Sequence, residues 1–240
     1  MHHVVIITTS KSYIERMVLL LKENFIVKDP GSAFTHFIGM VLSLFISFFL
    51  LLKSVKQNNA ISLVSIIVFS LSLILLYTAS TVYHTFDLTD KINKRLQKFD
   101  HMMIYLLIAG TYTPLCLIAL KGTVGYIMLA IIWTMAFIGI AKTAFVTNFP
   151  KWGSAIIYII MGWTCIFAFR PLSAILPLGG ILWLLIGGII YTIGGIIYAL
   201  HLPIFNTKHP NFGSHEIFHL FCLAGSACHV IFIYQYVLNI

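Results

Sequence analysis

Two long apolar segments of the sequence each carry histidine at one end. His84 closes the first segment, and His215 and His219 open the second as His-Glu-Ile-Phe-His. Side chains four residues apart lie on one face of a helix, and imidazoles on adjacent turns gain from sharing a metal. Imidazole is the commonest metal ligand and suits zinc, whereas polar groups are costly to keep in a bilayer. We therefore predict a zinc site with His84, His215 and His219 as its ligands.

This set of ligands is typical of a catalytic metal. Three protein ligands leave one position of a tetrahedral zinc open, and a water bound there has its pKa lowered to about 7. Ser80 lies one turn before His84 on the same helical face, so its hydroxyl could orient that water. Asp100 could accept the proton or hold the water by a hydrogen bond. We predict Asp100 and Ser80 as the catalytic residues beside the metal.

Each polar residue also has a simpler interpretation. Asp100 could cap a helix, because aspartate favours the N-cap position. The Ser80 hydroxyl could bond back to its own helix, and Glu216 could be a solvated charge at the interface. His229 lies about 21 Å beyond His215 along a helix, too far to share its metal, and is expected to line a cavity. A lone histidine at a helix end usually caps it or reaches the headgroups. That interpretation is given to His36, His101, His201 and His209.

The composition places these residues in a membrane protein. Of the 240 residues, 60% are hydrophobic and only 9% are charged, and the mean hydropathy is +0.98. A soluble domain carries far more charge. The net charge of +8 is distributed between apolar segments, which favours an anionic lipid surface over nucleic acid as partner. The four cysteines fall inside apolar segments without paired spacing, so we expect buried thiols rather than disulfides.

The apolar segments predict an all-α bundle that crosses the membrane seven times. Each is long enough to span about 30 Å of hydrocarbon. Residues 1–30 precede them as a separate N-terminal segment, with an amphipathic helix from Tyr13 to Phe25 expected on the membrane surface. Residues 31–240 form the transmembrane domain. The seven segments are expected near 32–53, 61–84, 101–120, 124–143, 152–170, 178–201 and 213–238.

The distribution of lysine and arginine predicts the orientation of the bundle. Most of them precede the first segment or lie in the loops near residues 91–98, 142–151 and 208. Because cytoplasmic loops are rich in these residues, the N-terminus is expected in the cytoplasm and the C-terminus outside. All seven acidic residues fall on the same cytoplasmic side. This topology brings His84, Asp100 and the histidines of the seventh segment to one depth.

The sequence His215-Glu-Ile-Phe-His219 also fits the His-Glu-x-x-His signature of zinc metalloproteases, in which the glutamate is the general base. Two observations disfavour a protease. The third candidate ligand, His84, is a histidine on a distant helix, and no aspartate-containing partner motif is found. Glu216 also follows His215 directly and so points about 100° away around the helix.

Four further stretches make the chain resemble a known family. The sequence is similar to bacterial haemolysin III proteins, which belong with the progestin and adiponectin receptor family, from about residue 28 to the end. The resemblance implies a seven-helix bundle with a cytoplasmic N-terminus. It also implies zinc bound by His84, His215 and His219, with Asp100 and Ser80 attending the zinc-bound water. The matching stretches are Gly31–His36, Ser80–His84, Phe99–Tyr105 with Ala109–Pro114, and Gly213–His219 with Ala227–His229.

A protein of the cell membrane with this site has several candidate functions, since fold does not settle function. The first is a ceramidase-like hydrolase of lipid amides or esters at the inner leaflet. The second is a non-enzymatic lipid sensor or regulator of membrane fluidity and homeostasis, in which zinc joins two helices. A pore-forming cytolysin is disfavoured because the chain is too apolar to be soluble before insertion. A proton transporter is disfavoured because the outer half lacks acidic residues. Membrane lipids are the expected partners, and the sequence leaves an oligomer open.

Overall fold

The structure, a computed structural model, describes residues 26–146, 149–200 and 212–240. The predicted amphipathic helix, His201 and His209 lie outside these residues. Within them, all regular structure is helical, and seven spans are long and apolar enough to cross a membrane. The protein is therefore a multi-pass integral membrane protein, as predicted. The helices are α2 (Pro30–Lys56), α3 (Ala60–Thr85), α4 (Asp90–Pro114), α5 (Gly122–Phe145), α6 (Lys151–Trp163), α7 (Phe169–Ile175), α8 (Leu178–Leu200) and α9 (Ser214–Gln235).

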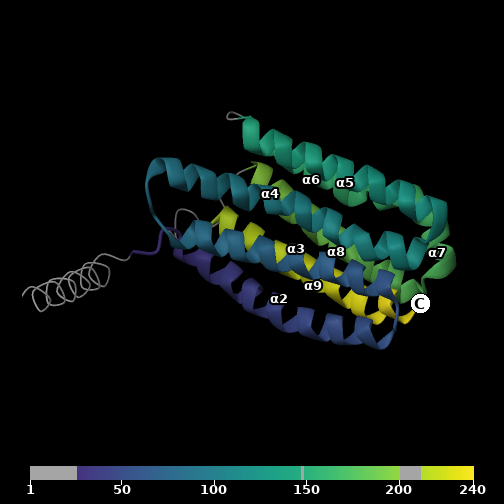
Figure 1. Cartoon of the computed structure of the whole chain (residues 1–240). Helices are drawn as coiled ribbons and strands as arrows, with labels where there is room; N and C mark the ends of the chain where they lie inside the picture. Colours follow the sequence, from purple (N-terminus) through teal and green to yellow (C-terminus); the bar gives the residue numbers. More distant parts are fainter. Residues whose placement is uncertain (1–25, 147–148, 201–211) are drawn as a thin grey trace, which may run out of the picture.

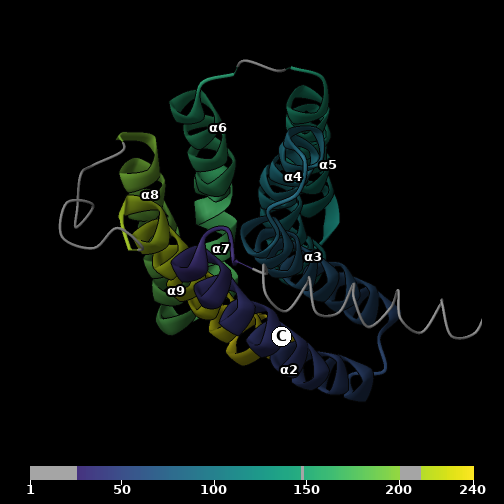
Figure 2. The ribbon, with the colours of Figure 1, turned by 90° about the vertical axis from the view of Figure 1, so that its left-hand side faces the viewer.

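The long helices run up and down in one bundle (Figure 1). α3 packs between α2 and α4, and α5 packs on α4. On the other side of the bundle, α8 packs between α6 and α9. The first and last spans, α2 and α9, also pack on each other, and Figure 2 shows α2 crossing between α9 and α3. This arrangement brings the start of α2, the end of α3 and the start of α9 to the same end of the bundle.

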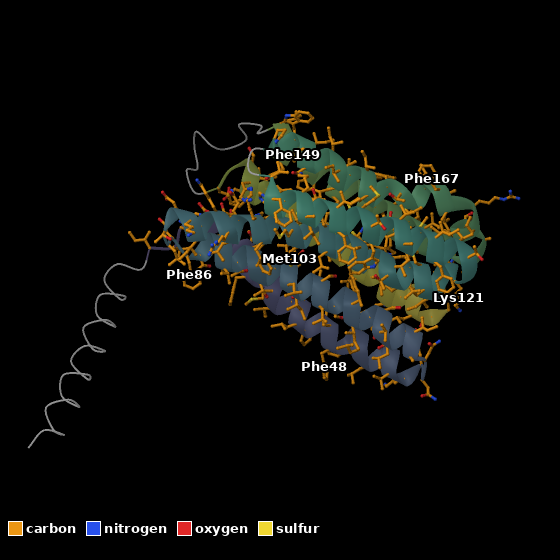
Figure 3. All side chains as sticks on the ribbon, turned by 45° about the horizontal axis from the view of Figure 1, so that its top comes forward. Phe48, Phe86, Met103, Lys121, Phe149 and Phe167 are labelled. Atoms are coloured by element: carbon orange, nitrogen blue, oxygen red, sulfur yellow. The ribbon has the colours of Figure 1, made fainter. Side chains whose placement is uncertain are left out.

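The outer surface of the bundle is apolar and its interior carries small polar residues. Phe48 and Phe167 are 59% and 86% exposed, and both side chains point outward in Figure 3. Such a surface suits lipid tails rather than water. Inside, α2 and α3 carry many small buried hydroxyl side chains, a residue type that allows membrane helices to pack closely. The buried serines of these helices include Ser43, Ser47, Ser54, Ser62, Ser65, Ser70 and Ser72.

The glycine pairs of α8 allow it to pack on two neighbours at once. A Cβ at Gly194 would lie 2.7 Å from Phe221 of α9. About 100° around the helix, a Cβ at Gly195 would lie 3.5 Å from Ile159 of α6. The absence of a side chain at Gly194 therefore lets α8 approach α9 closely. The four cysteines are all free, as predicted.

Two spans differ from the sequence prediction. The third span was expected to start near residue 101, but α4 begins at Asp90, because its first turns are polar and give no hydropathy signal. The fifth span is broken: a 3₁₀ stretch from Thr164 to Ala168 separates α6 from α7. Tyr112 of α4 hydrogen-bonds to backbone groups at this break: its hydroxyl donates to Gly162 O at 2.7 Å and accepts from the Cys165 N–H at 2.8 Å.

The α3–α4 contact offers a test of this packing. A Cβ at Gly110 would overlap Ser72 of α3, so Gly110→Ala is expected to force the helices apart. Overpacking of this kind costs about 1–3 kcal/mol. The melting temperature of the purified protein in detergent should fall by about 2–4 °C for each kcal/mol. Gly162→Ala is the matched control, because a Cβ there meets no atom within 4 Å in the described residues. Equal melting temperatures for both variants would contradict the packing described.

Candidate metal centre

The structure brings the three predicted ligand histidines together from two helices. His84 ends α3, and His215 and His219 lie in the first two turns of α9. One ring nitrogen from each lies within 4.8 Å of the others, and His84 Nε2 is 3.3 Å from His215 Nε2. His84 and His219 are each only 2% exposed. Three converging imidazoles of this kind could hold one metal ion, which fits the donor set expected for zinc.

The outer nitrogens of two rings each contact a group that only accepts hydrogen bonds. His84 Nδ1 is 2.9 Å from Asp29 Oδ2, and His219 Nδ1 is 3.3 Å from the carbonyl oxygen of Ser32. His219 Nδ1 is also 3.3 Å from the Thr35 hydroxyl, whose hydrogen is directed to backbone carbonyls of its own helix. Because a carboxylate and a carbonyl accept only, Nδ1 donates in both rings. Nε2 of each ring then keeps the lone pair that a metal requires. Both acceptors come from the start of α2, an element that supplies none of the three ligands.

Glu216 is engaged at the end of its own helix. Its Oε2 accepts from the Gly213 backbone N–H at 2.7 Å, and its Oε1 accepts from the Ser32 hydroxyl at 2.6 Å. The first contact satisfies a donor that helix ends leave unpaired. The second ties α9 to α2. With both oxygens used in this way, Glu216 is a capping residue, and its geometry disfavours the role of a protease base.

Asp100 and Ser80 both line the cavity that the histidine cluster enters. They are 7% and 1% exposed. Asp100 cannot be the N-cap of its helix, because α4 begins at Asp90. The carboxylate of Asp100 lies near enough to the Ser80 hydroxyl to interact with it, although Ser80 Oγ makes no hydrogen bond of standard geometry within the described residues. The alternative that Ser80 bonds back to its own helix is therefore wrong.

His36 belongs to the cluster, and its interpretation as a capping or snorkelling residue is wrong. The side chain is 3% exposed and stacks on His219 with ring centroids 3.6 Å apart. Neither of its ring nitrogens has a hydrogen-bond partner among the described residues. A signal for it was present in the sequence: Asp29, Ser32 and His36 are spaced by three and four residues, which places them on one helical face. His101 lines the cavity rather than the membrane surface.

The cavity runs from the histidines into the apolar interior of the bundle. His215, His219 and Asp100 lie at one end, and His229 and Phe232 lie farther along α9. His229 lines the cavity as predicted and stacks on Tyr191 with centroids 5.5 Å apart. Most of the remaining lining is apolar. Its members include Leu76, Ile104, Leu107, Ile108, Leu115, Ile159, Leu184 and Leu185.

These features define a multi-pass membrane protein with a largely buried histidine cluster beside a mostly apolar cavity. The family model described as "Haemolysin-III related" matches residues 25–230. The chain is 41% identical to Hemolysin-3 of Bacillus cereus over 216 residues, which are 90% of this chain and 94% of that protein. It is 39% identical to a Hemolysin-3 homolog of Bacillus subtilis (strain 168) over 204 residues, which are 84% and 91% of the two chains. The chain belongs to the haemolysin III family, within the progestin and adiponectin receptor superfamily.

The cluster predicts the metal content of the purified protein. Wild type is expected to carry about one zinc ion per chain, and His84→Ala or His219→Ala to lose most of it, because two imidazoles rarely complete a zinc site. His229→Ala is the matched control, since His229 is in the same cavity but about 15 Å from His219 along α9. Elemental analysis of the monodisperse proteins measures this. Equal zinc in His84→Ala and His229→Ala would contradict the assignment.

Proposed function

We propose that the protein is a zinc-dependent hydrolase of lipid amides or esters, similar to ceramidases, that acts at the inner leaflet. The observation that supports this most is that His215 and His219 line a largely apolar cavity together with Asp100 and Ser80, with the His84 ring grouped beside the two histidines. Pockets of this type, with a few convergent polar groups, are the usual sites of small-molecule chemistry. A lipid offers both parts that the site requires: an acyl chain for the cavity and a carbonyl for the polar end.

Each residue then has a defined task. Zinc, when bound by His84, His215 and His219, supplies a Lewis acid that activates water and polarises a carbonyl at neutral pH. The Asp100 carboxylate takes the proton from the attacking water and returns it to the leaving amine or alcohol. The Ser80 hydroxyl, which has no other hydrogen bond in the described structure, orients the water. The apolar lining holds the acyl chain and keeps bulk water out.

The location of the reaction follows from the predicted orientation. The histidine cluster lies where α3 ends and α9 begins, at the end of the bundle that carries the loop lysines and arginines. If that end is cytoplasmic, the site lies one or two helical turns below the inner headgroups. The ester or amide carbonyls of membrane lipids are found at this depth.

A lipid sensor without turnover is the second candidate. A metal held by the three imidazoles would join α3 to α9. Because Asp29 and Ser32, at the start of α2, contact the rings of His84 and His219, the metal would also fix α2 to the other two helices. In that case zinc is structural, and occupation of the cavity by a lipid would alter the bundle rather than start a reaction. The relatives are named haemolysins, and lysis could follow from altered membrane lipids in either case.

The substitution Asp100→Asn separates these candidates. The hydrolase proposal predicts that the variant keeps its zinc but hydrolyses lipid amides and esters at least 10²-fold more slowly, because a general acid–base group contributes about 10²–10⁴-fold. Mass spectrometry of lipids incubated with purified protein in vesicles measures the products. Asp90→Asn, an exposed acid on the same helix, is the control. Full turnover in Asp100→Asn would contradict the mechanism, and no products from wild type loaded with zinc would favour the sensor.

A further inference from the structure

The chain just before the first span is fastened to the end of α3. The Asp29 N–H donates to the His84 carbonyl at 2.9 Å, and the Lys28 N–H donates to the Thr85 carbonyl at 3.3 Å. The last carbonyls of a helix have no partner within the helix, so these two bonds complete the end of α3. The Lys28 ammonium also lies 3.7 Å from the centre of the Tyr83 ring. Residues 28–29 thus form a short strap across the helix end that carries a candidate ligand.

The strap fixes the position of the Asp29 carboxylate. The Asp29 N–H is bonded to the end of α3, as described above. The Asp29 carbonyl accepts from the Ala33 N–H at 2.8 Å, which is the first hydrogen bond of α2. Pro30 stands at the first helical position, where its fixed φ suits the helix and its missing N–H costs nothing. With its backbone held on both sides, Asp29 presents Oδ2 to His84 Nδ1 at 2.9 Å.

This contact contributes little to stability and therefore calls for another role. The Asp29 side chain is 41% exposed, whereas that of His84 is 3% exposed. Ion pairs and hydrogen bonds at such exposed carboxylates add little to stability, because water and salt screen them. The effect of this contact on the geometry of the site is larger, because a carboxylate bonded to Nδ1 of His84 fixes the orientation and the tautomer of the ring. Outer partners of this kind typically change metal affinity by about 10–100-fold.

We propose that Asp29 is a positioning residue of the metal site, which holds the His84 ring with Nε2 toward the ion, and that the Lys28–Asp29 strap is what places it. This inference rests on the proposed zinc site. His219 is held in the same manner by the Ser32 carbonyl and the Thr35 hydroxyl, each 3.3 Å from its Nδ1. The first turns of α2 are therefore the template that orients ligands from two other helices.

Zinc affinity measured by competition with a chelator tests the proposal without any assay of turnover. Asp29→Ala is expected to bind zinc about 10–100-fold more weakly than wild type. Asp29→Asn keeps an oxygen acceptor, so its zinc affinity is expected to lie between those of wild type and Asp29→Ala. Asp90→Ala is the matched control, since it removes one exposed acid near the same end of the bundle. The melting temperature of each metal-free protein should stay at the wild-type value.

A spectroscopic measurement tests whether Asp29 acts by orienting the His84 ring or only by its negative charge. With cobalt(II) in place of zinc, the visible bands of Asp29→Ala at saturating metal are expected to shift, because the His84 ring is no longer fixed. Those of Asp90→Ala should match wild type. Unchanged affinity and bands in Asp29→Ala, or equal loss of affinity in Asp29→Ala and Asp90→Ala, would overturn the role of Asp29 and leave the proposed function standing. Wild type that binds no zinc at all would overturn both.

Discussion

The structure depends on the cost of holding three imidazoles close together in an apolar interior. Polar groups buried without partners cost about 1–3 kcal/mol each. His84, His215 and His219 have ring nitrogens within 4.8 Å of one another. A metal ion satisfies all three at once, and neutral imidazoles are cheaper to bury than charged ones. The contacts around the cluster are consistent with this arrangement, because they hold the outer nitrogens of two rings as donors.

The helix that supplies none of the three ligands does most to organise them. Asp29, the N-cap of α2, contacts His84, and within α2 the Ser32 carbonyl contacts His219 and the Ser32 hydroxyl donates to Glu216. The imidazole of His36 stacks on His219 from the same helix. The histidine cluster is thus assembled from the first, second and seventh spans, and Asp100 of the third span lines the same cavity. The contacts of α2 with α9 give a physical reason for the close contact of the first and last spans.

Much of the architecture could be predicted from the sequence, because hydropathy and helix length follow directly from composition. The seven spans were of this kind. The placement of His229 in a cavity followed from its helical distance to His215. The start of α4 at Asp90 was missed because polar helical turns outside the hydrocarbon carry no apolar signal. The break between α6 and α7 was missed because it depends on Tyr112, a residue of another helix.

The hydrogen bonds that surround the histidine cluster could not be predicted from local sequence patterns. Ser32 and Glu216 are 184 positions apart, and Asp29 and His84 are 55 apart, so only the packed bundle brings them together. His36 was interpreted singly, as a residue at a helix end, although its spacing from Ser32 and Asp29 places all three on one face. The three histidines were found because two of them share a helix face and the predicted topology places the third at their depth.

X-ray absorption at the zinc edge of the purified wild-type protein tests the central claim most directly. The arrangement of His84, His215 and His219 predicts a four-coordinate ion with nitrogen and oxygen neighbours at about 2.0–2.1 Å. Scattering from three imidazole rings should be visible, and no sulfur should appear at about 2.3 Å. A sulfur shell, a site with fewer than two imidazoles, or protein that binds no zinc at all would contradict the account.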